Sequence, residues 1–259
     1  MLTGKTALVT GSTSGIGLGI AQVLARQGAR LVLNGFGDAE GAREAVAAAG
    51  ARAAAEVLHH PADMSKPGEI AEMMAFAARE AGRVDILVNN AGIQHVSAVE
   101  DFPPEKWDAI LAINLSSAFH TTRLALPAMR AAGWGRIVNI ASTHGLVASA
   151  MKSAYVAAKH GIVGLTKTVA LETATTGVTC NAICPGWVLT PLVQQQIDAR
   201  AAKGVPKEQA ERELLGEKQP SQQFTTPEQL GELTAFLCSP AGVNVRGVAW
   251  QVDGGWTAQ

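Results

Sequence analysis

The single tyrosine of this chain lies four residues before a lysine, a spacing that permits acid–base chemistry. On a helix, Tyr155 and Lys159 point to the same side, about 6 Å apart along the axis. A phenol with a pKa of about 10 is a poor base near neutral pH. A neighbouring ammonium group favours the phenolate, and lowering that pKa to about 7 or 8 corresponds to roughly 3–4 kcal/mol. The pair therefore indicates a phenolate base that removes a proton from a hydroxyl group.

A glycine-rich turn near the start of the sequence is suited to binding a pyrophosphate. Gly11, Gly15 and Gly17 follow an apolar run, 6–10, and precede a helical pattern over 16–27. Glycines allow a sharp turn and bring backbone N–H groups close to phosphate, and the helix N-terminus adds partial positive charge. The alternative interpretation is an ordinary tight turn between a strand and a helix.

Polar side chains close to these groups in the sequence indicate an anionic substrate. Lys152 lies about one helical turn before the tyrosine, and His144 lies two residues after Ser142, so that both point the same way in an extended loop. Gln94 and Gln196 add two amides at the same end of the fold. An ammonium, an imidazole and two amides suit a carboxylate close to the reacting carbon, whereas steroid or fatty-acyl pockets need apolar walls there.

Each of these four polar residues also has a simpler interpretation. Lys152 by itself suits a solvated surface lysine, and His144 suits a loop cap. Gln94 suits a turn residue. Gln196 ends a run of three glutamines, so either of the two preceding ones could make the contact instead. The convergence of all four on one volume favours the functional interpretation.

The elements that position these residues are short apolar runs alternating with Ala-rich helical patterns. Strands that alternate with helices pair in parallel, with helices on both faces of the sheet. We predict one α/β domain over residues 1–259, a doubly wound (Rossmann) fold whose seven-stranded parallel sheet is covered on both faces. The polar stretch 191–219 is predicted to form a small helical substrate lid within it. The expected strands are 6–10, 31–34, 56–59, 85–89, 136–140, 178–183 and 248–252, and the expected helices are 16–27, 39–49, 69–81, 105–132 with a kink at Pro127, 153–173 and 227–238.

Composition narrows the class of partner. The chain has 259 residues, 47% hydrophobic and 17% charged, with a net charge of −1. This balance is globular and argues against a nucleic-acid surface or a polybasic membrane anchor. Three scattered cysteines without zinc spacing favour reduced thiols in the cytoplasm and no metal site. We expect no signal peptide and no membrane span.

The glycine turn and five further motifs, covering essentially the whole chain, resemble those of the short-chain dehydrogenase/reductase family. The five are Asn89-Asn90-Ala91-Gly92, Asn114, Ser142, Tyr155-x-x-x-Lys159 and Pro185-Gly186. The resemblance implies a nicotinamide-dependent oxidoreductase in which Tyr155 is the general base, made acidic by Lys159 and the positive nicotinamide ring. It also implies that Ser142 stabilises the substrate oxygen and that Asn114 anchors a water that relays the proton. A homotetramer is implied in the same way.

The resemblance also predicts a cofactor site and its preference. No Lys or Arg lies between Arg30 and Arg43 to hold a 2′-phosphate, so NAD is favoured over NADP. The usual acidic ribose ligand is missing, since Asp38 comes late, and the backbone at 35–36 is the expected substitute. Asp63 matches the residue that holds the adenine amino group, and its alternative role is a helix cap. The implied cofactor-binding residues are Gly11, Thr13, Ser14, Gly15, Ile16, Gly17, Phe36, Asp63, Asn90, Ala91, Gly92, Tyr155, Lys159, Pro185, Gly186, Val188 and Thr190.

The polar set resembles that of family members that interconvert D-3-hydroxybutyrate and acetoacetate with NAD. An alternative is an NADPH-dependent reductase of 3-oxoacyl thioesters or of another ketone, which predicts the missing cation. A third possibility is a catalytically silent nucleotide sensor, which predicts a broken tyrosine–lysine pair, and here the pair is intact. The implied substrate-binding residues are Gln94, His144, Lys152, Trp187, Gln196 and Trp256, the two tryptophans covering a short alkyl end.

Overall fold

The strands form one parallel sheet. The computed structural model describes residues 1–50, 56–216 and 218–258, except for the side chains of Leu192 and Gln196. In this part of the chain, seven strands pair in parallel in the order β3-β2-β1-β4-β5-β6-β7. Their bounds are β1 Thr6–Val9, β2 Arg30–Asn34, β3 Leu58–His60, β4 Ile86–Asn89, β5 Gly135–Ile140, β6 Val178–Pro185 and β7 Ala249–Val252.

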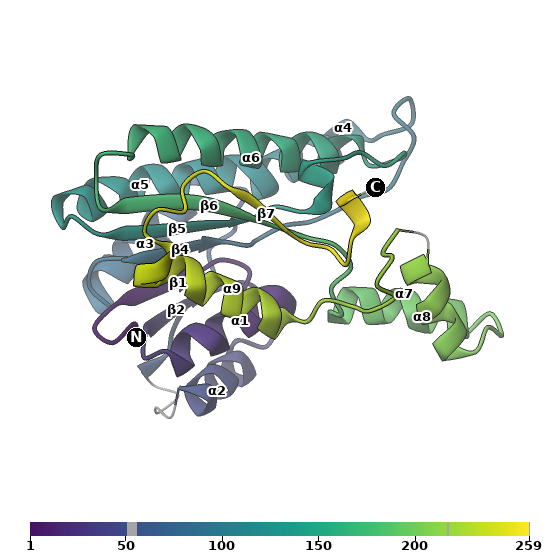
Figure 1. Cartoon of the computed structure of the whole chain (residues 1–259), viewed down its shortest axis with the longest axis horizontal. Coiled ribbons are helices and arrows are strands. Elements are labelled where there is room, and N and C mark those ends of the chain that lie inside the picture. Colours follow the sequence, from purple (N-terminus) through teal and green to yellow (C-terminus); the bar gives the residue numbers. More distant parts are fainter. Residues whose placement is uncertain (51–55, 217, 259) are drawn as a thin grey trace.

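Helices cover both faces of this sheet, as the alternating pattern predicted (Figure 1). Helices α1, α2 and α9 pack on one face, and α3, α5 and α6 pack on the other. Helix α9 begins with a capping box, in which Thr226 and Gln229 exchange side-chain to backbone hydrogen bonds of 3.2 and 2.9 Å. The helix bounds are α1 Gly15–Arg26, α2 Ala39–Ala49, α3 Pro67–Glu80, α4 Pro104–Leu111, α5 Ser117–Ala131, α6 Ser153–Glu172, α7 Pro191–Ala201, α8 Lys207–Gly216 and α9 Pro227–Cys238.

The central strands are buried on both sides, which explains their continuous apolar runs. Successive side chains of a strand point to opposite faces. Thus Val9 and Val88 join the core under α1 and α9, whereas Leu8 and Leu87 join the core under α3 and α5. Burial on both faces is the arrangement expected for a parallel sheet covered by helices on each side.

The strand order reverses between β1 and β4, and this reversal positions the site. In open α/β sheets, a crevice opens at the carboxyl ends of the strands where the order reverses. The loops that follow β1 and β4 here carry the glycine turn and the Asn90-Ala91-Gly92 motif. The topology therefore brings together two motifs that lie about 80 residues apart in the sequence.

One expected helix differs from the observed structure. The pattern over 105–132 predicted a continuous helix kinked at Pro127. The structure instead has α4, a wide π-helical turn at Ala112–Ser116 and α5, with Pro127 inside α5. The irregularity lies at the buried Asn114, whose side chain bonds to a neighbouring loop, and π-turns of this kind accommodate such an extra residue.

The polar stretch 191–219 forms α7 and α8, which project from the body (Figure 1). Val193, Ile197, Ala210 and Leu214 form a small core of their own between the two helices, and Trp187 packs against it. None of the described helices is both long and apolar enough to cross a membrane.

Candidate active site

The glycine turn leaves an open helix N-terminus that fits a phosphate group. A Cβ on Gly17 would lie 2.3 Å from the Gly11 carbonyl oxygen, and Gly15 has a φ of +55°, so side chains are excluded where the backbone must approach a ligand. Ser14 is the N-cap of α1, yet its side chain makes no capping hydrogen bond. The first N–H groups of α1 are therefore left without a side-chain cap, as an anion-binding helix terminus requires.

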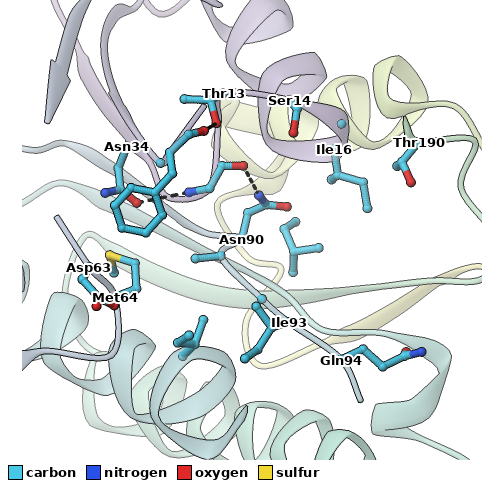
Figure 2. A pocket seen from close by; sticks show the side chains of 18 of the residues that line it. Thr13, Ser14, Ile16, Asn34, Asp63, Met64, Asn90, Ile93, Gln94 and Thr190 are labelled. Carbon is cyan, nitrogen blue, oxygen red and sulfur yellow. Dashed lines mark hydrogen bonds between the residues drawn. The ribbon is translucent and has the colours of Figure 1, made fainter. Parts of the chain in front are cut away.

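Asn90 joins this turn to the loop after β4. Its Nδ2 donates to the carbonyl oxygens of Thr10 and Gly11, both at 2.9 Å. The Thr10 hydroxyl in turn accepts from the backbone N–H groups of Asn90 and Ala91 at 3.0 Å. Figure 2 shows Asn90 between Asp63 and Met64 at one end of the cleft and Gln94 at the other. These bonds hold the two predicted cofactor motifs in one rigid unit.

A cleft of about 440 Å³ runs along these loops. Most of the predicted cofactor residues line it, whereas Gly17, Pro185, Gly186 and Val188 lie outside its lining. The sequence reasoning missed Asn34, whose amide at the end of β2 accepts from Gly11 N–H at 3.2 Å. The sequence could have indicated Asn34 only through its position as a polar residue at the end of a predicted strand. The predicted residues that line the cleft are Gly11, Thr13, Ser14, Gly15, Ile16, Phe36, Asp63, Asn90, Ala91, Gly92, Tyr155, Lys159 and Thr190.

The loop after β2, which is expected to contact the ribose of the cofactor, carries no positively charged side chain. Gly35 has a φ of +145°, and the Thr13 hydroxyl donates to the Phe36 carbonyl at 2.6 Å. Asp38 is occupied in capping α2, where it accepts from Gly41 N–H at 2.9 Å. Among the described residues that line the cleft, Lys159 at the opposite end is the one Lys or Arg.

Asp63 lines the cleft, and its alternative role as a helix cap is wrong. The Asp63 carboxylate accepts from the backbone N–H and the hydroxyl of Ser65 at 2.9 and 2.7 Å, which is a local turn before α3. The N-cap of α3 is Lys66. The hydrogen bonds from Ser65 lower the pKa of Asp63, so the carboxylate is charged at neutral pH and able to accept a further hydrogen bond from a ligand.

The predicted catalytic side chains come together where β5 ends and α6 begins. Ser142 follows β5, and α6 carries both Tyr155 and Lys159. Lys159 is buried, its Nζ donates to the Ile140 carbonyl at 2.8 Å, and it lies 5.5 Å from the centroid of the tyrosine ring. Ser142 acts on Tyr155 by lowering the pKa of the phenol, which favours the phenolate. The fold therefore brings Ser142, Tyr155 and Lys159 together.

Burial opposes the ionisation of these groups. It lowers the pKa of Lys159 to about 8 and raises the pKa of Tyr155 above its ordinary value, an effect that Ser142 offsets only partly. The positive charge of Lys159 therefore does not by itself overcome the effect of burial on the pKa of Tyr155. The further positive charge expected from the resemblance is that of the nicotinamide ring.

Because Tyr155 is the single tyrosine of the chain, its ionisation can be observed directly. We expect no tyrosinate absorbance near 295 nm below about pH 10 in the protein without cofactor, since burial disfavours the charged form. An excess of oxidised cofactor should move the titration to lower pH. Ultraviolet difference titration with and without cofactor measures both states, and an identical midpoint would contradict the role of the second positive charge.

Asn114 contacts the β4 loop rather than the lysine. Its Oδ1 accepts from Ile93 N–H and its Nδ2 donates to the Ile93 carbonyl, both at 2.9 Å. Its amide is therefore used in holding the loop that follows Gly92. A water anchored here beside Lys159 stays a prediction.

His144 lies beside the tyrosine, but its ring nitrogens already have neighbours in the protein, whereas the sequence predicted an imidazole available to bind the substrate carboxylate. Its Nε2 lies 2.9 Å from the Ser149 hydroxyl, and its Nδ1 lies 3.4 Å from the Ser142 hydroxyl. Burial, and then the charge of Lys152, lower the pKa of His144 to about 4, so the imidazole is neutral at pH 7. Ser149, which the sequence reasoning missed, stands in no motif that could have indicated it.

Aromatic rings extend from the tyrosine to the predicted alkyl end. His144 packs edge-on against both Tyr155 and Trp256, with centroids 5.9 and 5.4 Å apart. Trp256 lies 6.4 Å from Trp187, and Lys152 Nζ lies 5.9 Å from the centroid of the Trp187 ring. Four of the six predicted substrate residues therefore form one series of contacts that begins at the phenol.

The two predicted glutamines have different outcomes. Gln94 is exposed and lines the far end of the cleft, where Figure 2 shows it apart from the nucleotide loops. Its loop is joined to that of Lys152 because Ser97 N–H donates to the Met151 carbonyl at 3.0 Å. Gln196 belongs to α7, but its side chain lies outside the described residues, so its contact is untested.

Comparison with known proteins identifies the family of the chain. The family model described as short chain dehydrogenase matches residues 5–201, so the chain belongs to the short-chain dehydrogenase family, a class of oxidoreductases with a nucleotide-binding Rossmann fold. D-beta-hydroxybutyrate dehydrogenase of Cupriavidus necator is 69% identical over 100% of both chains. The Rhizobium meliloti enzyme of the same name is 57% identical over 98% of this chain and 99% of its own. The crystal structure of levodione reductase superposes with a TM-score of 0.91 at 32% identity, covering 100% of this chain and 99% of the other.

Proposed function

We propose that this protein catalyses the NAD-dependent, reversible oxidation of D-3-hydroxybutyrate to acetoacetate. The observation that supports the proposal is the series of contacts that joins Tyr155, through His144, to the Trp187–Trp256 pair and Lys152. A four-carbon hydroxy acid has an anionic group two bonds from the reacting carbon and a single methyl group beyond it. The names of the two relatives at 69% and 57% identity support the same substrate.

In this mechanism, Tyr155 removes the proton from the C3 hydroxyl while Ser142 donates a hydrogen bond to the same oxygen. Lys159 stabilises the phenolate through its positive charge. The nicotinamide cofactor, when bound, supplies the acceptor for the hydride that leaves C3. In the reverse direction, the tyrosine hydroxyl returns the proton to the ketone oxygen of acetoacetate.

The carboxylate of the substrate is proposed to lie near Lys152, with the amide of Gln94 at the mouth of the cleft. Trp187 and Trp256 cover the methyl end and leave little room for a longer chain. When the hydroxyl lies at Tyr155 and the carboxylate at Lys152, only one enantiomer would also direct its C3 hydrogen towards a bound nicotinamide and its methyl group towards the tryptophans. We therefore expect the L enantiomer to be a poor substrate.

The cofactor is proposed to be NAD, because the described lining of the ribose end carries no Lys or Arg for a 2′-phosphate. Charged hydrogen bonds to such a phosphate contribute roughly 1.5–3 kcal/mol, which corresponds to about 10- to 150-fold in kcat/KM. We expect kcat/KM for NAD to exceed that for NADP by at least this ratio. Initial rates with each cofactor at saturating D-3-hydroxybutyrate measure it, and a preference for NADP would favour the reductase alternative.

A substrate panel with NAD tests the proposed activity. It contains D-3-hydroxybutyrate, L-3-hydroxybutyrate, 2-butanol and a 3-hydroxybutyryl thioester. Turnover of the D acid far above the other three is expected, since it alone combines the charge and the correct hand. Faster oxidation of the thioester or of 2-butanol would contradict the carboxylate site.

Three further features belong to the proposal. Helices α7 and α8 are proposed to act as the substrate lid, because Trp187 packs against their common core. The buried, unpaired thiols of Cys180, Cys184 and Cys238 fit the reducing cytoplasm. The homotetramer follows from the family resemblance.

A further inference from the structure

Gln219, at the end of the α7–α8 segment, is an almost completely buried amide, 1% exposed. Its Oε1 accepts from the backbone N–H of Trp187 at 2.8 Å. Its Nε2 donates to the Gln223 carbonyl, so both ends of the amide are paired. A buried amide with both ends paired holds its partners in one arrangement, because leaving either end unpaired has an energetic cost.

Two glycines make room for this side chain. A Cβ on Gly186 would lie 2.5 Å from Gln219 Oε1, and a Cβ on Gly254 would lie 2.6 Å from its Cγ. Gly186 directly precedes Trp187, and Gly254 lies two residues before Trp256. The Gln219 side chain therefore packs between the exit of β6 and the C-terminal turn, the two segments that carry the tryptophans.

In the described part of the chain, the indole nitrogen of Trp187 makes no hydrogen bond that could hold the ring in place. The Nε1 of Trp187 is buried and has no hydrogen-bond partner among the described residues. The ring is therefore held by packing, while its backbone is held on both sides. The Trp187 N–H donates to Gln219, and the Trp187 carbonyl accepts from Thr225 N–H at 2.9 Å. On the other side, Ser221 N–H donates to the Gly254 carbonyl at 2.9 Å, which joins the loop after Gln219 to the turn before Trp256.

We propose that Gln219 is a positioning residue that determines the chain length of the accepted 3-hydroxy acid, by setting the spacing of Trp187 and Trp256. The inference rests on the proposed function for the identity of the substrate. The ring centroids lie 6.4 Å apart at an interplanar angle of 31°. At this spacing the two rings pack against each other and would close the space beyond the substrate's methyl group, whereas a looser pair would admit an ethyl group.

The test compares Gln219→Met, which keeps the length of the side chain and removes both hydrogen bonds, with Gln223→Met. Gln223 has an exposed side chain in the same loop, so it is a matched control. For Gln219→Met, KM for D-3-hydroxybutyrate should rise about tenfold, as expected for loss of a buried hydrogen bond. The change in kcat and in KM for NAD should be much smaller, and kcat/KM for D-3-hydroxyvalerate should rise relative to the four-carbon acid. Gln223→Met should match the parent protein.

A second measurement does not depend on activity. Two indoles at this distance couple in near-ultraviolet circular dichroism, and Trp187→Phe identifies the coupled signal. Gln219→Met should weaken that signal and Gln223→Met should retain it. If Gln219→Met does not fold, Gln219→Glu, which keeps an acceptor oxygen for Trp187, is compared by the same two measurements.

The inference would be overturned if Gln219→Met lowered Tm but changed neither the circular dichroism signal of the tryptophan pair nor the ratio of kcat/KM for D-3-hydroxyvalerate to kcat/KM for D-3-hydroxybutyrate. Gln219 would then be a purely structural residue. If the parent protein does not oxidise D-3-hydroxybutyrate, the proposed function fails separately. The circular dichroism comparison still decides whether Gln219 positions the tryptophan pair.

Discussion

Replacing Tyr155 with phenylalanine should lower kcat for oxidation of D-3-hydroxybutyrate roughly a thousandfold or more, because general acid–base catalysis contributes up to about four orders of magnitude. The ring contact with His144 is retained in this variant, so the aromatic packing should survive. The phenol oxygen that we propose as the acceptor of the substrate proton is lost. Steady-state rates with saturating NAD measure the effect.

A measurement of NAD binding shows whether Tyr155→Phe has lost only the catalytic base or has also lost the structure of the cofactor site. The nucleotide loops are held by Asn90 and Thr10, which do not contact the tyrosine hydroxyl. Titration of NAD against the intrinsic tryptophan fluorescence should therefore give a dissociation constant close to that of the parent protein. Turnover within about tenfold of the parent protein would refute the assignment of Tyr155 as the base.

Removing the charge of Lys152 should affect the acid substrate far more than a neutral alcohol. A charged hydrogen bond of about 1.5–3 kcal/mol corresponds to roughly a 10- to 150-fold loss in kcat/KM. For Lys152→Ala, we expect this loss for D-3-hydroxybutyrate, mainly in KM, and little change for 2-butanol. Lys167→Ala is the matched control, since Lys167 is an exposed lysine on the same helix, α6.

The same variant also tests the electrostatic contact with His144. The charge of Lys152 contributes to holding the pKa of His144 low, second to burial. Its removal should therefore raise the pKa of His144, although burial keeps the imidazole neutral at pH 7.

The kinetic comparison decides the role of Lys152 in binding the substrate. Equal losses of kcat/KM for D-3-hydroxybutyrate and for 2-butanol would exclude Lys152 as the carboxylate ligand.

Much of the fold could be predicted because its signals are local. Apolar runs of a few residues indicated the strands, and the Thr226-Pro227 start of α9 was correct to the residue. The prediction over 105–132 was wrong in its interior because the π-turn at Asn114 depends on a contact with Ile93, about 20 residues earlier in the chain. Periodicity within a helix contains no information about such a contact.

By itself, the sequence determined the chemical groups of the site and their attachment to particular elements: the Tyr155–Lys159 pair on one helix, the glycine turn, and the polar residues beside them. Residue types and short spacings suffice for this, since a helical turn fixes which side chains share a face. Only the tertiary structure decided the protonation and the neighbours of those groups. Burial lowers the pKa of His144 and raises that of Tyr155, and Gln219 bonds to Trp187 across 32 residues. Desolvation and long-range hydrogen bonds exist only once distant segments pack together, so no local pattern in the chain could have indicated them.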